Sequence, residues 1–289
     1  MLESSVQGSK GQLLRILSYN VQVGIRTSHP RHYITGSWKH ILPCPKRLQN
    51  LDVIATEISD FDIVGLQEVD AGSIRSNFIN LAEYLAGRAE FPFWHHQVNR
   101  NLGRFAKHSN GILSHYKPAE VTDLRLPGLI PGRQAILARY ESGKDTLAVI
   151  VVHLALSKRA RLQQLEYLSE IVNDHPHAIV MGDMNCRCHS DEMQLLFNKT
   201  NLREPLEDMH TFPSWRPMYN IDHILVTSEL KVRQAKALES PMSDHLPIMT
   251  EVELPSGLQL SRFEKSNLLS FDKYMENIKF KTTYQRLKG

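Results

Sequence analysis

Short apolar segments recur along the whole chain, and most have the length and the branched side chains of buried β-strands. These segments predict strands at residues 15–21, 62–69, 111–116, 133–140, 146–156, 177–181, 221–226 and 246–254. The sequence Glu141-Ser142-Gly143-Lys144-Asp145 separates two of them and is rich in turn-forming residues. It therefore predicts a β-hairpin.

Three other segments repeat apolar residues at the spacing of an amphipathic helix. One begins at Pro45, a residue suited to the first turn of a helix, and continues to Ile58. The other two cover residues 77–86 and 158–173. Strands and helices alternate at first, a pair of strands follows, and the alternation then resumes. This order predicts an α/β fold in which two mixed β-sheets pack together with helices outside them.

The chain has no short internal repeat and no low-complexity linker. We therefore predict one large domain over residues 10–254, followed by a basic C-terminal tail over residues 255–289. The tail has seven Lys or Arg and three Asp or Glu, a net charge of +4, whereas the whole chain carries +3. The domain itself is therefore close to neutral, so any anion that it handles has to be recognised locally.

Cysteine usage and hydropathy predict the compartment. The three cysteines are sparse and odd in number, which indicates reduced thiols rather than a disulfide framework. The sequence Cys186-Arg187-Cys188-His189 lacks the second ligand pair of a zinc finger, so packing of buried thiols is the preferred interpretation. No apolar segment has the length of a membrane span or a signal peptide. We therefore expect a cytoplasmic protein.

Polar residues that could carry chemistry stand at the ends of the predicted strands. They are Asn20, Glu68, His153, Asp183, Asn185, Asp222, Asp244 and His245. A carboxylate at the end of a buried strand is unfavourable unless a cation or a hydrogen-bond donor meets it. One shared cation would explain why so many acids and amides gather there. Oxygen donors with few thiols favour Mg²⁺ or Mn²⁺ over zinc.

Seven short motifs follow one another in an order that resembles a known family. They are Leu17-Ser18-Tyr19-Asn20, Leu66-Gln67-Glu68-Val69, Asn110-Gly111-Ile112-Leu113-Ser114, His153-Leu154, Gly182-Asp183-Met184-Asn185, Ile221-Asp222-His223-Ile224 and Ser243-Asp244-His245-Leu246-Pro247. Together they resemble the endonuclease/exonuclease/phosphatase superfamily, which includes DNase I, abasic-site endonucleases, neutral sphingomyelinases and inositol polyphosphate 5-phosphatases. Gly-Asp-x-Asn followed by Ser-Asp-His is the specific combination. The resemblance covers about residues 13–254 and implies a four-layer α/β/β/α sandwich.

The resemblance also implies a divalent-metal-dependent phosphoesterase that hydrolyses a P–O bond by direct attack of water. Its cofactor would be Mg²⁺ or Mn²⁺. Glu68 would be the principal metal ligand, and Asn20 and Asp244 would complete the metal environment.

Five further residues acquire catalytic or substrate-binding roles from the resemblance. Asp183 would orient or deprotonate the attacking water, and Asn185 would hold a phosphoryl oxygen or, with Asp183, a second metal. His245 would contact the phosphate while Asp222 fixes its tautomer. His153 would donate to a phosphoryl oxygen or to the leaving group.

Arginines near these motifs are candidates for an anion pocket, because a guanidinium group pairs well with phosphate. We select Arg75 and Arg161 as substrate-binding residues, with Arg104 as a further candidate. A solvated or salt-bridged arginine is the alternative at each position.

The substrate class stays open between nucleic acid and a phospholipid head group or another small phosphate. The His153 match resembles the nuclease and sphingomyelinase branches and favours a phosphodiester. The near-neutral domain argues against tight non-specific DNA binding. A phosphomonoesterase is the nearest alternative. An inactive binding module is a different class, and the presence of Glu68, Asp183 and His245 argues against it. Nothing in the pattern indicates a protein partner.

Three segments outside the motifs have two interpretations each. Residues 24–44, with three histidines, form either a substrate-selecting lid or an ordinary surface loop. Residues 211–217 form either an aromatic rim over the site or a packing loop. The tail places Phe271, Tyr274 and Ile278 at helical spacing between lysines. It either packs on the domain or makes peripheral contact with an anionic membrane.

Overall fold

A computed structural model describes residues 11–27, 29, 31, 44, 46–128, 132–205 and 208–263. These residues form two six-stranded sheets. The first has the order β11 (Lys231–Ala237), β12 (Ile248–Glu253), β1 (Leu13–Asn20), β2 (Ile63–Asp70), β4 (Lys107–Ser114), β3 (Phe93–Asn101). The second has the order β5 (Glu120–Arg125), β6 (Gln134–Ser142), β7 (Asp145–His153), β8 (His177–Asp183), β10 (Asp222–Thr227), β9 (Leu202–Arg203).

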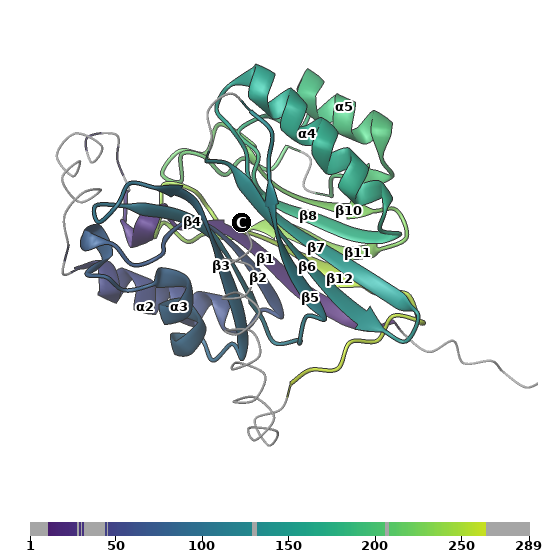
Figure 1. Cartoon of the computed structure of the whole chain (residues 1–289), viewed down its shortest axis with the longest axis horizontal. Coiled ribbons are helices and arrows are strands. Elements are labelled where there is room, and N and C mark those ends of the chain that lie inside the picture. Colours follow the sequence, from purple (N-terminus) through teal and green to yellow (C-terminus); the bar gives the residue numbers. More distant parts are fainter. Residues whose placement is uncertain are drawn as a thin grey trace, which may run out of the picture.

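Helices close the outer faces of both sheets and complete four layers (Figure 1). The first sheet is covered by α2 (Lys46–Ile58) and α3 (Leu81–Arg88), and the second by α4 (Lys158–Asn173) and α5 (Asp191–Lys199). Both sheets are mixed, because β1 runs parallel to β2 and β7 parallel to β8 whereas the other pairings are antiparallel. The predicted α/β/β/α sandwich is confirmed.

Alternate residues of the central strands build the core between the two sheets. Leu14 and Ile16 of β1 belong to this layer, as do Ile179 and Met181 of β8. The intervening residues pack under the helices. A period of two is the natural consequence of a pleated strand. At Gly65 the sheets approach so closely that a Cβ atom would lie 2.9 Å from Cε of Met181.

The strands that the sequence pattern does not predict are β3, β5, β9 and β11, and these are the four edge strands of the two sheets. An edge strand is buried less completely, so its sequence need not contain an apolar run. The pattern also misses α5 and starts α3 too early. Asn80 caps α3 by accepting hydrogen bonds from the backbone N–H groups of Ala82 and Glu83, so residues 77–80 precede the helix.

The packed domain continues beyond the predicted boundary at residue 254. Leu258 is completely buried and Leu260 is 8% exposed, and both belong to the core between the sheets. Backbone N–H of Leu260 donates to Oε1 of Gln12, which ties this segment to the start of β1. Removal of residues after 256 would therefore expose the core. The Phe271, Tyr274 and Ile278 pattern lies outside the described residues, as does most of the 24–44 insertion.

Within the described ranges, no helix combines the length and hydrophobicity that a membrane crossing requires.

Candidate active site

Four of the predicted site residues extend the rows of side chains that face the opposite sheet. Asn20 follows Leu14 and Ile16 at the same parity in β1, and Asp183 follows Ile179 and Met181 in β8. His153 and Asp222 extend the corresponding rows of β7 and β10. Because these rows all face the layer between the sheets, their polar ends meet at one end of the sandwich.

Glu68 reaches the same region through an irregularity in β2. The pairing of β2 with β4 shifts between Leu66 and Val69, and Glu68 has a left-handed φ of 56°. A bulge of this kind inserts an extra residue and redirects a side chain. Glu68 therefore lines the pocket beside the cluster although regular alternation would not place it there.

The turn after β8 is shaped by Gly182 and Asn185. Gly182 has φ 144°, and a Cβ atom there would lie 1.9 Å from the carbonyl oxygen of Val152, so no other residue fits. Backbone N–H of Asn185 donates to Oδ1 of Asp183 at 2.9 Å, and its side-chain amide donates to the Leu154 carbonyl at 3.0 Å. An amide group has two hydrogens, so one remains for a ligand.

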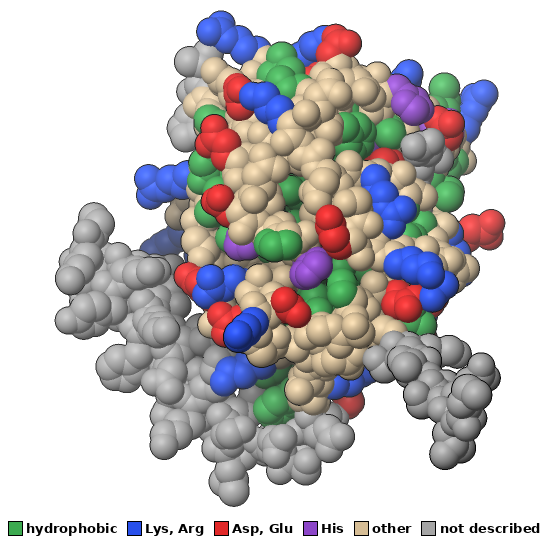
Figure 2. Space-filling view, turned by 90° about the vertical axis from the view of Figure 1, so that its right-hand side faces the viewer, with side chains coloured by type: hydrophobic (Ala, Val, Ile, Leu, Met, Phe, Trp, Pro, Cys, Tyr) green, Lys and Arg blue, Asp and Glu red, His purple; other side chains and the backbone are tan. Residues whose placement is uncertain are grey.

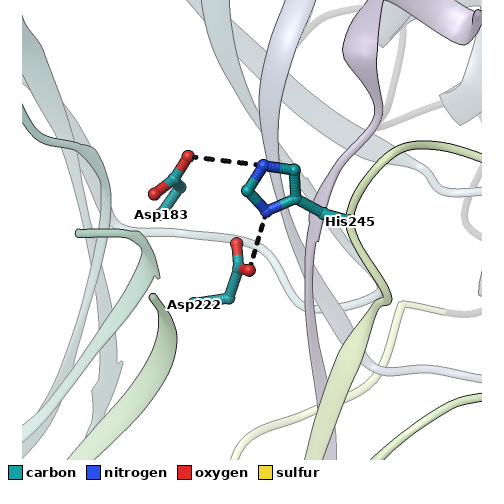
Figure 3. A group of neighbouring side chains, drawn as sticks. All are labelled: Asp183, Asp222 and His245. Carbon is teal, nitrogen blue, oxygen red and sulfur yellow. Dashed lines mark hydrogen bonds and ion pairs between the residues drawn. The ribbon is translucent and has the colours of Figure 1, made fainter. Parts of the chain in front are cut away.

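Oδ2 of Asp183 is the point at which the cluster converges. Nδ2 of Asn20 donates to it at 3.1 Å. Nε2 of His153 lies 3.4 Å from it, and Nε2 of His245 lies 3.9 Å from it (Figure 3). The contact with Asn20 joins β1 to β8, so it connects the two sheets.

His245 lies in the segment before β12, and Asp222 of β10 in the second sheet orients it. Nδ1 of His245 lies 2.8 Å from Oδ2 of Asp222 (Figure 3), and the hydroxyl of Thr211 donates to the same oxygen. The ring of Phe212 lies 4.7 Å from the imidazole, between centroids. Thr211 and Phe212, from the loop over residues 211–217, therefore contact the site and support Asp222 and His245.

Burial and neighbouring charges shift the pKa values of these groups strongly. Burial raises the pKa of Asp183 to about 7, with the Asp222 and Glu68 carboxylates adding to the rise and His245 opposing it. The pKa of His245 is raised to about 10, because Asp222 and Asp183 outweigh the effect of burial. Burial lowers the pKa of His153 well below its usual range, and the positive charge of Arg133 adds to this. His153 is therefore a neutral imidazole beside a cationic His245.

Glu68, Asp244 and Asn20 offer the oxygen donors that a hard cation requires. Burial raises the pKa of Glu68, and the negative charge of Asp244 raises it further, while an Asn20 side-chain hydrogen bond opposes the rise. Two carboxylates held together in a buried place repel each other unless a cation neutralises them. Carboxylate and amide oxygens are also the ligands that Mg²⁺ and Mn²⁺ prefer. The residues present therefore fit a divalent metal.

Among the described residues, one group of acids and histidines has ligand atoms close enough together to hold a metal, and it is not the set that the sequence motifs predict. Asp183, Asp222 and His245 each have one possible ligand atom within 4.8 Å of the others. Nδ1 of His245 is already hydrogen-bonded to Asp222, however. The short distances between these three side chains also suit acid–base catalysis, which is the role that the sequence motifs predict for them.

The structure does not bring Arg75 or Arg161 to the cluster, which corrects the predicted choice of arginines. Nε of Arg75 pairs with Asp70 at 2.6 Å, and its side chain is 3% exposed. Arg161 pairs with Glu192 at 2.7 Å and donates to the Ala155 and Leu156 carbonyls. Both guanidinium groups hold loops in place, and neither they nor Arg104 line the pocket.

A pocket of about 530 Å³ opens beside the cluster. Glu68 and His153 line it, together with the start of α4 and the ends of β3 and β4. Arg133 and His108 also line it, and the sequence motifs did not indicate either. Burial lowers the pKa of His108 to about 4, so its imidazole is neutral. Arg133 could have been found from the hairpin register: Ala135 pairs with Val152, so Arg133 falls beside the His153 end of β7.

Comparison with known families identifies the class of protein. The model of the endonuclease/exonuclease/phosphatase family matches residues 17–245, which is most of the chain. The protein belongs to this family. The matched region begins in β1 and ends at His245, so it contains every motif that builds the cluster.

Solved structures share the fold at low sequence identity. An endonuclease/exonuclease/phosphatase family protein from Bacteroides thetaiotaomicron has a TM-score of 0.64 and 18% identity, over 85% of this chain and 99% of that one. A mannosyl-6-phosphatase from the same organism has a TM-score of 0.61 and 18% identity, over 83% and 99%. The human Nocturnin catalytic domain with bound sulfate has a TM-score of 0.62 and 19% identity, over 84% and 95%. No curated protein sequence matches this chain significantly.

The family and these neighbours include phosphatases and nucleases, which supports a hydrolase that acts on phosphoesters.

Proposed function

We propose that this protein is a Mg²⁺- or Mn²⁺-dependent phosphodiesterase that hydrolyses a P–O bond by direct attack of water. The observation that carries the proposal is the convergence of Asn20, His153 and His245 on one carboxylate oxygen of Asp183. A carboxylate in this position can orient a water molecule, and the imidazoles beside it can meet the oxygens of a phosphoryl group.

The proposed roles follow from the contacts of each residue. Asp183 orients the attacking water and takes its proton. His245, held by Asp222, places Nε2 against a phosphoryl oxygen and supplies positive charge. Neutral His153 donates a hydrogen bond to a phosphoryl oxygen or to the leaving group. Asn185 offers its remaining amide hydrogen to the same phosphate.

Glu68, Asn20 and Asp244 would hold the divalent metal. When bound there, it would add positive charge where the phosphoryl oxygens gain negative charge in the transition state. The first sheet would thus contribute the metal ligands Asn20 and Glu68, and the segment before β12 would contribute Asp244. The second sheet contributes Asp183, Asp222 and His153.

The near-neutral charge of the domain and the size of the pocket support a small substrate over a long nucleic acid. One face of the molecule has basic and acidic side chains interspersed, without a continuous basic stripe (Figure 2). Non-specific binding of nucleic acid depends on many simultaneous phosphate contacts. A pocket of about 530 Å³ instead has the size typical of small-molecule sites.

A panel of esters tests the proposal. The purified protein is incubated with Mg²⁺ or Mn²⁺ and bis(p-nitrophenyl) phosphate, p-nitrophenyl phosphate, single-stranded DNA and RNA, or phospholipid vesicles. We expect metal-dependent hydrolysis that chelation with EDTA abolishes, with the diester cleaved faster than the monoester. Faster cleavage of the monoester would establish the phosphomonoesterase alternative, in line with the mannosyl-6-phosphatase among the neighbours. No cleavage of any ester would favour a binding module.

Replacement of Asp222 by asparagine tests the orienting role. An amide at this position lacks the negative charge that favours the His245 imidazolium, so we expect kcat to fall about 10- to 100-fold with KM little changed. The ¹⁵N resonances of the His245 ring should report a changed protonation state. Asp174→Asn, at the exposed end of α4, is the matched control. Unchanged kcat and unchanged ring resonances in Asp222→Asn would contradict the role.

A further inference from the structure

The pocket beside the cluster has an excess of positive charge. Arg100, Arg133 and Arg159 line it from three separate segments: the end of β3, the residue before β6, and the first turn of α4. Among the described residues that line it, Glu68 is the one carboxylate. The domain as a whole is close to neutral, so this concentration of arginines is local and not a result of overall charge.

These arginines differ from the other arginines near the site in their partners. Arg75 and Arg161 each hold a carboxylate, at 2.6 and 2.7 Å. By contrast, within the described part of the chain no carboxylate oxygen lies within the 4.0 Å ion-pair limit of Arg100, Arg133 or Arg159. Three cations that converge on one pocket without an ion pair provide binding capacity for an anion.

Arg133 is the deepest of the three. It is half-buried, and burial lowers its pKa while the charges of Asp183 and Glu68 oppose that effect. It is therefore the pocket arginine on which the charges of the catalytic carboxylates act. Arg100 and Arg159 are exposed, on the outer part of the pocket wall. The positive charge thus extends from the catalytic cluster outward, instead of ending at the site of the scissile phosphate.

We infer that the substrate is a small phosphate ester with a second phosphate group, and that Arg100 and Arg159 bind this second phosphate. The inference rests on the proposed function, because the first phosphate has to lie against Asp183, His153 and His245. Guanidinium groups suit the second phosphate, since each can donate two parallel hydrogen bonds to it. Ala155, Leu156 and Ala160 also line the pocket and offer apolar surface to the carbon spacer that joins the two phosphates.

Direct binding tests the inference independently of hydrolysis. Calorimetry in EDTA compares 1,4-butanediol bisphosphate with n-butyl phosphate, which has the same carbon chain but one phosphate. We expect the wild-type protein to bind the bisphosphate at least about tenfold more tightly. In the double variant Arg100→Gln/Arg159→Gln this preference should fall below about threefold. Arg88→Gln, which removes an arginine from the exposed face of α3, should keep it.

The outcomes distinguish the subsite from the proposed function. No preference for the bisphosphate, or a preference that the double variant retains, would overturn the second-phosphate site. A folding check by thermal unfolding excludes a trivial loss in the double variant. If the preference is present and depends on the arginines but no ester is hydrolysed with Mg²⁺ or Mn²⁺, the subsite stands and the proposed hydrolytic function fails.

A second experiment distinguishes a small-molecule substrate from the phosphorylated end of a nucleic acid. Thymidine dinucleotides with and without a 5′-phosphate share the same diester bond and differ only in the second phosphate. A preference that appears for the 5′-phosphorylated dinucleotide and not for the alkanediol bisphosphate would overturn the small-molecule inference in favour of a nucleic acid terminus. For each pair, kcat/KM of the compound with the second phosphate is divided by kcat/KM of the compound without it. This ratio should be about tenfold or more higher in the wild type than in the double variant.

Discussion

Replacement of Asp183 by asparagine is expected to lower kcat by about 10²- to 10⁴-fold, the range of a lost general base. The amide cannot take a proton from water. Its NH₂ group would also face the Nδ2–H donor of Asn20, so the hydrogen bond from Asn20 would be lost. The fold should persist, because asparagine has the same shape and can still accept from the N–H of Asn185 at its other oxygen position. Steady-state kinetics on the best ester of the panel, with thermal unfolding in parallel, measure both effects.

Asp174→Asn serves as the control for this experiment as well, since it makes the same chemical change on the surface. A decrease in kcat of less than about tenfold, with an intact fold, would show that Asp183 is not the base. In that case Asp183 would act only as the acceptor that holds Asn20 and Asn185 in place.

Replacement of Glu68 by glutamine is expected to abolish detectable binding of Mg²⁺. Glu68 is the carboxylate that lies beside Asp244, and a neutral amide removes one of the two negative charges that the cation would neutralise. Unfolding experiments give a readout apart from activity. In the wild type, saturating Mg²⁺ at about 100 times Kd should stabilise the fold by about 2.7 kcal/mol. In Glu68→Gln this metal-dependent increase in Tm should disappear.

Without metal, Glu68→Gln should unfold at the same temperature as the wild type or higher, because the substitution removes repulsion between buried carboxylates. Glu83→Gln, in the first turn of α3, is the matched control and should keep the metal-dependent increase. If Glu68→Gln kept the wild-type affinity for Mg²⁺, the metal would have to bind elsewhere. Asp183, Asp222 and His245 would then be the first group to test.

The sequence predicted the central strands from their apolar, branched residues, and it predicted the polar residues that close them from their place at the strand ends. The period of two explains why several of these polar residues meet. Once Ile179 and Met181 are placed in the core, Asp183 must face the same layer. The position of Glu68 does not follow from this rule, since it depends on a bulge that involves pairing with β4. The motif, and not the periodicity, identified that residue.

The arginines show where the sequence could not decide. Arg75 and Arg161 lie close to motifs in the sequence, but their partners Asp70 and Glu192 are revealed only by the folded structure. The position of Arg133 beside the end of β7 could have been predicted from the register of the β6–β7 hairpin, because that register follows from the turn at residues 143–144. Arg100 and Arg159 had no such signal. They converge only because an edge strand, absent from the sequence-based prediction, lies next to the start of α4 in the pocket wall.

The proposed active site takes residues from both sheets, and this determines when activity can arise during synthesis and folding. Asn20 and Glu68 belong to one sheet and Asp183 and Asp222 to the other, so on the proposed division of labour neither sheet alone carries a complete set of reacting groups. His245 follows in the chain only after both sheets have nearly all their strands. A partly assembled chain is therefore expected to lack the proposed activity. On the proposed function, ester cleavage is therefore expected only after the two sheets have packed together and the pocket has formed.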